Sequence, residues 1–295
     1  NHEAFLKWFW AYRPEAVHSH SVWTDLIRFL LLPAQMSKIQ VSHLHLYHPL
    51  LFDFSKSDPD RNWLFKKYEA SRTQLVAVSP SQYKKALAKW PKSIAQQLHL
   101  VPNGVELPEI KRSRTNGDGV PHLLVASSLE DRKNIEAPLG VLAALHAKGI
   151  LATMSVAGDG SQLETLKGIA EKAKLNTFIT WHGAVKNMSK FYASGDFLVF
   201  TSANETFGLV PLEAMAIGLP VVAMHNSAPY FTHPDNVWMS ENLDITGVVE
   251  GVLTLWGDPN RLLKQVENGF QTATKHKIED TTKDILSLYL KCDTL

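Results

Sequence analysis

Residues 194–223 read SGDFLVFTSANETFGLVPLEAMAIGLPVVA, and this stretch decides the fold. An apolar strand over 196–202 is followed by a polar loop, a helix over 209–218 and a second strand over 220–224. Pro211 suits the first turn of that helix, because the first turn tolerates a missing backbone N–H. Strand–helix–strand units of this size are typical of parallel sheets covered by helices.

The same alternation extends over most of the chain. The sequence predicts further strands at 16–20, 38–46, 74–79, 98–105, 122–127, 151–158 and 177–183. It predicts further helices at 22–32, 61–71, 132–148 and 161–174, and three helical segments after the last strand. We therefore expect an α/β protein with two Rossmann-like, doubly wound domains. In that architecture, ligands bind at the carboxyl ends of the strands and in the cleft between the domains.

A polar stretch rich in Pro and Gly, residues 106–120, is the best candidate for a linker. We expect an N-terminal Rossmann-like domain over 1–107 and a second one over 108–275. The last helix, 276–295, is expected to pack back on the N-terminal domain.

Composition excludes several classes of protein. The 295 residues include 30 basic and 29 acidic side chains, so the balance indicates no nucleic-acid partner. One cysteine excludes an intrachain disulfide and fits a reducing compartment. We see no apolar run long enough to cross a membrane and no signal-peptide pattern. The sequence therefore predicts a cytoplasmic protein.

Two glutamates lie in the deciding stretch. Glu205 follows a strand, and Glu213 lies just over one turn into the next helix, so both carboxylates can face the space before that helix. Backbone N–H groups of Phe207, Gly208 and Leu209 line the same space and suit a phosphate. Carboxylates only accept hydrogen bonds, which suits sugar hydroxyls. A nucleotide diphosphate sugar would satisfy all these groups. The alternative is that one glutamate caps the helix and the other is exposed.

A diphosphate also requires cations. Arg132 and Lys133 follow the strand over 122–127, at the expected start of a helix. Cations are slightly unfavourable there, which favours a phosphate-binding role for Lys133. The alternative is a solvated helix start.

These residues resemble the retaining glycosyltransferases of family 4 (glycosyl transferases group 1), which have the GT-B fold. The resemblance covers most of residues 70–290. The matching segments, in order, are VPNGVE (101–106), SSLEDRKN (127–134), VAGDGSQLETLK (156–167), WHGAV (181–185), the long stretch 194–223 and the closing LSLYL (286–290).

The resemblance implies a role for each matching residue. The residue matching Glu213 holds the nucleotide ribose, Glu205 contacts the donor sugar and Lys133 binds the diphosphate. The loop from His182 to Val185 borders the base. The full set implied at the donor site is Ser128, Arg132, Lys133, His182, Gly183, Val185, Glu205, Thr206, Phe207, Gly208, Leu209 and Glu213.

The N-terminal half resembles the family at PEAVHSHSVW (14–23) and SHLHLYHP (42–49). His20 is then expected near the donor sugar and the acceptor, and His45 and His48 are further candidates for the cleft. The catalytic set implied by the resemblance is His20, Glu205 and Lys133.

The chain departs from the family pattern at three places. Ser127-Ser128-Leu129 replaces a Gly-Arg-Leu that supplies a second phosphate-binding cation, and MHNSAPYF (224–231) replaces a Gly-Gly-x-x-Glu stretch. The family's opening strand with its Gly-rich turn is absent, so we expect a truncated N-terminal domain.

The implied activity is transfer of a sugar from a nucleotide diphosphate sugar to a hydroxyl of a carbohydrate or lipid-linked acceptor, with retention. We expect no cofactor and no metal, since no His, Asp or Glu cluster has metal-ligand spacing. Polysaccharide, lipopolysaccharide or glycolipid assembly is the usual role of similar chains.

The aromatic stretch 5–13, with Lys7 and Arg13, suggests peripheral membrane contact, although a core helix explains it equally well. Alternatives are an epimerase, a phosphorylase, or a degenerate GT-B domain that binds a nucleotide sugar or a partner chain without turnover.

Overall fold

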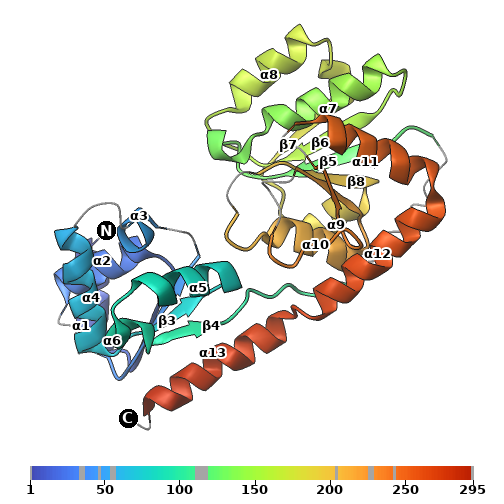
Figure 1. Cartoon of the computed structure of the whole chain (residues 1–295). Helices are drawn as coiled ribbons and strands as arrows, with labels where there is room; N and C mark the ends of the chain where they lie inside the picture. The colour runs from blue at the N-terminus through green and yellow to red at the C-terminus, as the bar shows by residue number, and fades with distance from the viewer. Residues whose placement is uncertain are drawn as a thin grey trace. The chain divides into compact units, whose positions relative to one another are not determined.

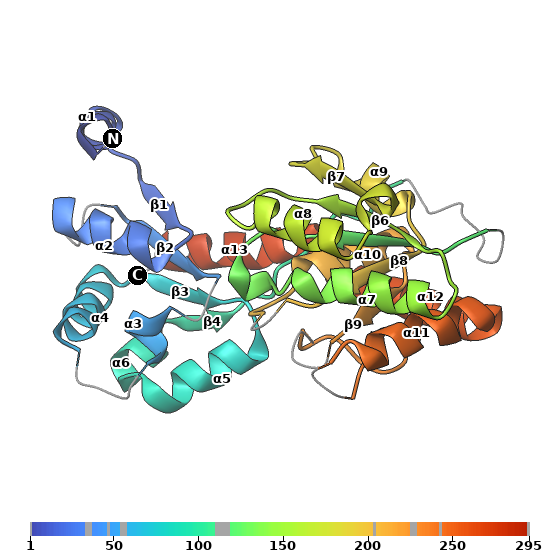
Figure 2. The ribbon, with the colours of Figure 1, turned by 90° about the horizontal axis from the view of Figure 1, so that it is seen from above.

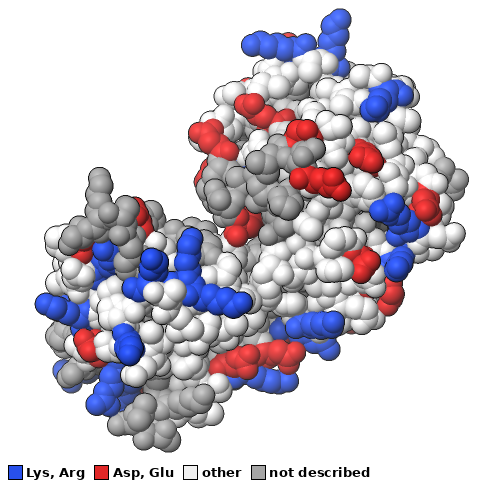
Figure 3. Space-filling model, viewed as in Figure 1, with Lys and Arg blue, Asp and Glu red and all other residues white. Residues whose placement is uncertain are grey.

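The computed structural model describes residues 2–32, 37–45, 48–53, 58–109, 119–202, 205–224, 229–241 and 244–293. The chain divides into two compact units. The first comprises residues 1–104 and 278–295, and the second comprises residues 105–277 (Figure 1). On the face drawn in Figure 3, basic and acidic side chains are present on both units, in keeping with the formal net charge of +1.

The first unit is built on a parallel sheet with strand order β1-β2-β3-β4. Its elements are α1 His2–Tyr12, β1 Ala16–Ser19, α2 Val22–Leu31, β2 Ile39–Leu44, α3 Pro49–Phe52, α4 Pro59–Ser71, β3 Gln74–Ala77, α5 Pro80–Lys89, α6 Lys92–Ala95, β4 Leu98–Leu100 and α13 Ile278–Asp293. Side-chain oxygens of Ser21, Asp58 and Ser79 cap the N-termini of α2, α4 and α5.

The two faces of this sheet have separate cores. Helices α2 to α6 bury Leu44, Leu64, Tyr68 and other apolar side chains against one face. On the opposite face, Leu288 of α13 packs with Val41 and other residues of the sheet. Figure 2 shows α13, in red, running alongside this sheet. The C-terminal helix is therefore part of the first unit.

A buried carboxylate joins the elements of the first face. Asp25 of α2 is fully buried and accepts hydrogen bonds from the hydroxyl groups of Ser19, Ser42 and Tyr68. The guanidinium of Arg28 lies 3.2 Å from the same carboxylate and completes its neutralisation. Burial, followed by the charge of Asp25, raises the pKa of Tyr68. Because burying an unpaired charge is costly, this network ties α2 and α4 to β1 and β2.

Helix α1 exposes most of its aromatic side chains. Trp8, Trp10 and Tyr12 are 49%, 53% and 72% exposed, whereas Phe9 is 2% exposed. A helix packed wholly in a core would bury all four. Among the described aromatic side chains of this segment, one is buried and three are exposed, and the membrane contact suggested for it stays a prediction.

The second unit is built on a six-stranded parallel sheet with strand order β10-β9-β8-β5-β6-β7. Its elements are β5 His122–Ala126, η1 Asp131–Lys133, α7 Glu136–Ala147, β6 Thr153–Ala157, α8 Leu163–Lys172, η2 Asn176–Phe178, β7 Ile179–Gly183, α9 Met188–Ala193, β8 Phe197–Phe200, α10 Leu209–Ile217, β9 Val221–Ala223, β10 Trp238–Met239, α11 Thr246–Gly257 and α12 Pro259–Thr274.

Helices cover both faces of this sheet (Figure 1). The main core lies between one face and helices α7, α8 and α11. On the other face, α10 packs against α9 and α12. The strand order changes direction between β5 and β8, so the carboxyl ends of these two neighbouring strands lie together. In doubly wound sheets, ligands bind at such a point.

The expected strands and most expected helices are present, and the α/β class is confirmed. The helix expected from residue 132 is wrong at its start. The short helix η1 ends at Lys133, Asn134 interrupts the helix with φ of 49°, and α7 begins at Glu136. Helices α3, α6 and α9 and strand β10 were not among the predicted elements. Helix α5 begins where Ser79-Pro80-Ser81 predicts a helix start, and α1 includes most of the segment for which a helix was the alternative. Most of the expected linker, residues 110–118, lies outside the described residues.

Candidate functional site

The start of α10 presents backbone rather than side-chain groups. Gly208 occupies the position before the helix with φ of 88°, and no side chain among the described residues caps this end. A Cβ at Gly208 would lie 2.3 Å from Cγ of Pro229, so both the dihedral angle and the space require glycine. The N–H groups of the first turn therefore face forward without a side-chain cap, which suits an anion.

A cation and a carboxylate meet in front of this helix. The Nζ atom of Lys133 lies 2.5 Å from Oε1 of Glu205, and the hydroxyl of Ser202 donates to the same oxygen at 2.5 Å. The two charged side chains are only 15% and 16% exposed. They come together because Lys133 follows β5, Glu205 follows β8, and these strands are neighbours in the sheet. The adjacent Thr206 hydroxyl is buried and has no hydrogen-bond partner among the described residues.

Glu213 belongs to the same helix and has a different partner. The Tyr192 hydroxyl of α9 donates to Oε2 of Glu213 at 2.7 Å. Burial raises the pKa of Glu213, and the hydrogen bond from Tyr192 opposes that rise. Burial also raises the pKa of Tyr192, as does the neighbouring carboxylate. The alternative in which one glutamate caps the helix and the other is exposed is wrong, since each carboxylate is held by a specific side chain.

An aromatic cluster packs against Phe207, in the loop that precedes α10. The ring of Phe207 is 3% exposed and contacts Tyr230, Phe231 and His276 at centroid distances of 5.6, 5.5 and 6.0 Å. The Tyr230 hydroxyl and Nε2 of His276 are 2.9 Å apart, and burial raises the pKa of Tyr230 to about 12. Phe207 therefore anchors the loop, and Leu209, which is exposed, lies on the outer side.

The loop containing Ser128 is fixed by the turn after β6. The backbone N–H of Leu129 donates to Asp159 at 2.9 Å, and the N–H of Gln162 donates to Leu129 at 3.0 Å. A Cβ at Gly158 would lie 1.8 Å from the carbonyl oxygen of Ser127, so the two loops pack backbone to backbone. The side chain of Arg132 lies outside the described residues, so its expected phosphate contact stays a prediction.

The segment expected to border a base follows β7. The ring of His182 is exposed, and its Nε2 atom lies 3.1 Å from the hydroxyl of Ser155. Its edge contacts the ring of Phe191 in α9. Gly183 has φ of 61° and its carbonyl accepts from the N–H of Gly158 at 2.8 Å, while Val185 is half-buried. The base-binding role of these residues stays a prediction.

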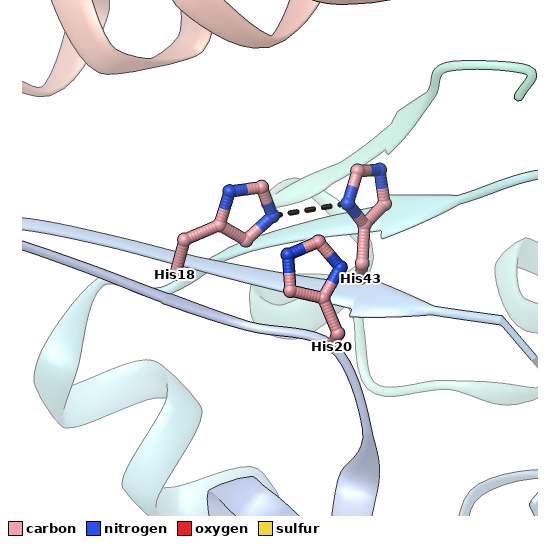
Figure 4. A group of neighbouring side chains, drawn as sticks. All are labelled: His18, His20 and His43. Carbon is pink, nitrogen blue, oxygen red and sulfur yellow. Dashed lines mark hydrogen bonds between the residues drawn. The ribbon is translucent and has the colours of Figure 1, made fainter. Parts of the chain in front are cut away.

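The histidines of the first unit form a cluster that the sequence analysis did not anticipate. The rings of His18, His20, His43 and His45 stack side by side, three of them drawn in Figure 4. His48 stands apart, with its ring edge against Trp23 at 5.2 Å. Spacing along the chain showed no metal-ligand pattern, but strand pairing brings ligand atoms of His18, His20 and His43 within 4.8 Å of one another.

Several contacts of the candidate site could not be found from the sequence alone. Ser202 lies in the recognised stretch 194–223, but its contact with Lys133 through Glu205 depends on strand order. Tyr192 lies in α9, which was not predicted, and its contact with Glu213 depends on the packing of α9 against α10. Tyr230 and His276 are separated by 46 residues and meet only in the folded second unit. The neighbouring residues 225–228 lie outside the described residues.

A separate surface pocket of about 640 Å³ lies near β10 in the second unit, bordered by Trp238, Glu250 and Arg261 among others. None of the predicted site residues lines it. Arg261 stacks on the Trp238 ring at 4.6 Å, so its charge is already engaged there.

With this geometry in view, the comparisons with known proteins decide the family. Residues 107–272 match the family described as "Glycosyl transferases group 1", a span of more than half the chain. The chain belongs to the glycosyl transferases group 1 family. The match covers β5 to α12, and so includes Lys133, Glu205 and Glu213.

A curated relative agrees with this membership, and solved structures show the same fold. The chain is 32% identical over 149 residues to "Alpha-monoglucosyldiacylglycerol synthase" of Streptococcus pneumoniae, a match that covers 45% of this chain and 33% of the relative. It superposes on sucrose-phosphate synthase from Thermosynechococcus elongatus with a TM-score of 0.80 at 19% identity, covering 99% of this chain and 77% of that one. It superposes on Anabaena Alr3699/HepE "in complex with UDP and glucose" with a TM-score of 0.75 at 18% identity, covering 92% and 77%.

These likenesses confirm the expected GT-B fold with two Rossmann-like sheets. The chain spans 33% to 43% of the length of the first curated glycosyltransferase relatives that it matches. Within the portion of the chain that the structure describes, no helix combines the length and the apolar character needed to cross a bilayer.

Proposed function

We propose that this chain transfers a sugar from a nucleotide diphosphate sugar to an acceptor hydroxyl with retention of configuration. The observation that carries the proposal is the ion pair between Lys133 and Glu205, 2.5 Å apart at the uncapped start of α10. Membership in the glycosyl transferases group 1 family supports it. Neighbouring solved structures that contain UDP support uridine diphosphate as the nucleotide part of the donor.

The ion pair suits a ligand that carries both charge and hydroxyl groups. The Lys133 ammonium attracts a diphosphate, and the N–H groups of the first turn of α10 add hydrogen bonds to it. The Glu205 carboxylate repels phosphate but accepts hydrogen bonds from sugar hydroxyls. The buried hydroxyl of Thr206, which has no hydrogen-bond partner within the described part of the chain, offers a further hydrogen bond at the same place. We propose that the donor's phosphate–sugar junction occupies this position.

Glu213 is proposed to hold the ribose. Its carboxylate is half-buried and already accepts one hydrogen bond from Tyr192. A carboxylate has room for further donors, and vicinal ribose hydroxyls supply two. Ser128, Arg132 and the 182–185 loop are proposed to border the diphosphate and the base.

In the proposed reaction, the diphosphate leaves while positive charge develops on the sugar. Lys133 and the helix dipole of α10 stabilise the leaving diphosphate, and Glu205 orients the sugar. No protein nucleophile is required, because the donor phosphate assists deprotonation of the acceptor. His20 is proposed to hydrogen-bond near the sugar. We propose that the transfer needs neither a metal nor a cofactor.

The proposed role is glycolipid, polysaccharide or lipopolysaccharide assembly at the cytoplasmic side of a membrane. The likeness to alpha-monoglucosyldiacylglycerol synthase supports a lipid-linked acceptor. So does the exposure of Trp8, Trp10 and Tyr12 on α1, together with Trp23 and Leu30 on α2. Aromatic side chains of this kind favour the interface of a bilayer.

A transfer assay tests the proposal. After a thermal-shift screen of nucleotide sugars identifies a donor, the chain is incubated with that donor and with glycolipid or oligosaccharide acceptors. We expect release of the nucleoside diphosphate, with an NMR spectrum showing the donor's anomeric configuration in the product. Glu205→Gln should lower turnover at least tenfold, whereas the exposed Glu164→Gln should not. An inverted product would contradict retention.

The same assay distinguishes the alternative function, a GT-B domain that binds a nucleotide sugar or partner chain without turnover. Ser127-Ser128, in place of the Gly-Arg of the family pattern, favours this alternative because one phosphate-binding cation is absent. Donor binding without release of nucleoside diphosphate under any acceptor would support it and contradict the transferase.

A further inference from the structure

Strand pairing builds a ladder of histidines in the first unit. β1 and β2 are parallel, with His18 opposite Val41 and Ser19 opposite Ser42. Successive side chains of a strand point to opposite faces, so His18 and His20 share a face with Val41, His43 and His45. That face is the one covered by α13, because Val41 packs with Leu288. The other face carries Ser19 and Ser42, which are bound to Asp25.

The imidazole nitrogens converge at the carboxyl ends of these two strands. Nε2 of His18 lies 3.0 Å from Nδ1 of His43, as Figure 4 shows. Nδ1 of His20 lies 3.1 Å from Nε2 of His45. One ligand atom from each of His18, His20 and His43 fits within 4.8 Å. Two ligands of a tetrahedral zinc ion, with bonds of about 2.0–2.1 Å, lie about 3.4 Å apart.

A small rotation of one histidine ring therefore suffices to bring the three nitrogens to bonding distance of a single ion. The nitrogens of His18 and His43, 3.0 Å apart, are close to the separation of about 3.4 Å between two ligands of one zinc ion. His20 is the most exposed of the three, so its ring is the one free to turn.

The cluster has little structural reason to consist of histidines. His43 is 5% exposed, and its Nε2 atom has no hydrogen-bond partner among the described residues. Buried imidazoles retained for structure normally have both nitrogens satisfied.

A second group orients the cluster. The Tyr289 hydroxyl of α13 lies 2.7 Å from Nδ1 of His18, on the side of the ring away from His43. In metal sites, a hydrogen bond to the far nitrogen of a histidine ligand fixes its tautomer and orientation. Tyr289 therefore leaves Nε2 of His18 directed at the cluster.

We propose that His18, His20 and His43 form a binding site for one divalent transition-metal ion, with Zn²⁺ as the physiological candidate. Imidazole ligands suit Zn²⁺, Cu²⁺ and Ni²⁺ better than Mg²⁺ or Ca²⁺, which require oxygen ligands. His45 lies beside His20, with its Nε2 atom 3.1 Å from Nδ1 of His20. His20 is also the residue proposed to lie near the sugar, but the test of the metal site requires neither donor binding nor activity.

Calorimetric titration of the tag-free chain with ZnCl₂ at pH 7.5 tests the proposal. We expect one saturable site, and no comparable binding of MgCl₂. His43→Ala and His20→Ala should each lower the affinity at least tenfold, and Tyr289→Phe should lower it about 10- to 100-fold. His233→Ala is the matched control, because His233 is exposed on the second unit and pairs with Asp235. Cobalt titration should give the intense visible absorption of a tetrahedral ion.

The exposed His20 keeps the test informative if His43→Ala does not fold, since His20→Ala removes a ligand without opening the core. Circular dichroism and thermal unfolding report whether each variant is native. Saturable binding that disappears in native His20→Ala but persists in His233→Ala supports the site. No saturable zinc binding by the wild-type chain, or equal binding by native His20→Ala and His233→Ala, would overturn it.

Discussion

At the residue scale, Glu213 illustrates a conflict between stability and ligand binding. Burial raises its pKa, so the folded state disfavours the ionised carboxylate. A group with a raised pKa contributes stability below its unfolded pKa and loses that contribution as the pH rises through its folded pKa. Glu213→Gln should therefore raise the melting temperature slightly at pH 7.5, and the gain should shrink toward pH 4. The amide still accepts from Tyr192. Differential scanning calorimetry at both pH values checks this, and a lower melting temperature at pH 7.5 would contradict it.

Also at the residue scale, the sequence predicted the segment of each acid but not its partner. Glu205 was expected in a loop after a strand and Glu213 inside the following helix, and the structure has both there. Lys133 and Glu205 are 72 residues apart, and their contact depends on β5 lying beside β8. No local pattern encodes strand order. The histidine cluster was missed for the same reason, since His18 and His43 meet through strand pairing.

At the element scale, α2 depends on the Asp25 network. Asp25→Ala would leave the Arg28 guanidinium buried without its carboxylate, so unfolding free energy should fall by about 3–5 kcal/mol. Urea denaturation measures this loss. The control is Asp280→Ala, which removes an exposed ion pair with Lys283 and should change stability by less than about 1 kcal/mol. Equal effects of the two substitutions would contradict a structural role for the network.

A second prediction at the element scale concerns Gly208, at the start of α10. Gly208→Ala forces a Cβ into Pro229 at a positive φ, so stability should fall by at least about 1 kcal/mol and donor affinity should fall with it. Gly257→Ala is the matched control, because a Cβ there meets no atom within 4 Å. Thermal unfolding of both variants checks this prediction. A Gly208→Ala chain as stable as the control would show that the loop adapts.

Element boundaries were predicted well at Gly183, where β7 ends, and at Gly218, just after α10, and poorly at the start of α7. The residues 131–135 have helical composition, but Asn134 adopts a left-handed conformation. Helix α9 is only six residues long, too short for a clear helical period, and was not predicted.

At the scale of the whole molecule, the two units should respond differently to acid. The pKa values of His18 and His43 are lowered to about 4 and about 3, so the unfolded state binds more protons below pH 6.5. Stability of the first unit should therefore fall as the pH drops from about 6.5 toward 4. Hydrogen exchange with EDTA present should show β1 and β2 losing protection before β5 and β6. The reverse order would contradict this account.

The central claim is that Lys133 and Glu213 hold a nucleoside diphosphate in front of α10, and one calorimetric experiment tests it directly. UDP is titrated into the wild-type chain, Lys133→Ala, Glu213→Gln and the control Lys167→Ala, which removes an exposed lysine paired with Glu164. Because hydrogen bonds to charged groups contribute about 1.5–3 kcal/mol, each of the first two substitutions should weaken binding about 10- to 100-fold. Lys167→Ala should bind as the wild type does. Saturable UDP binding with equal affinity in all four proteins would contradict the claim.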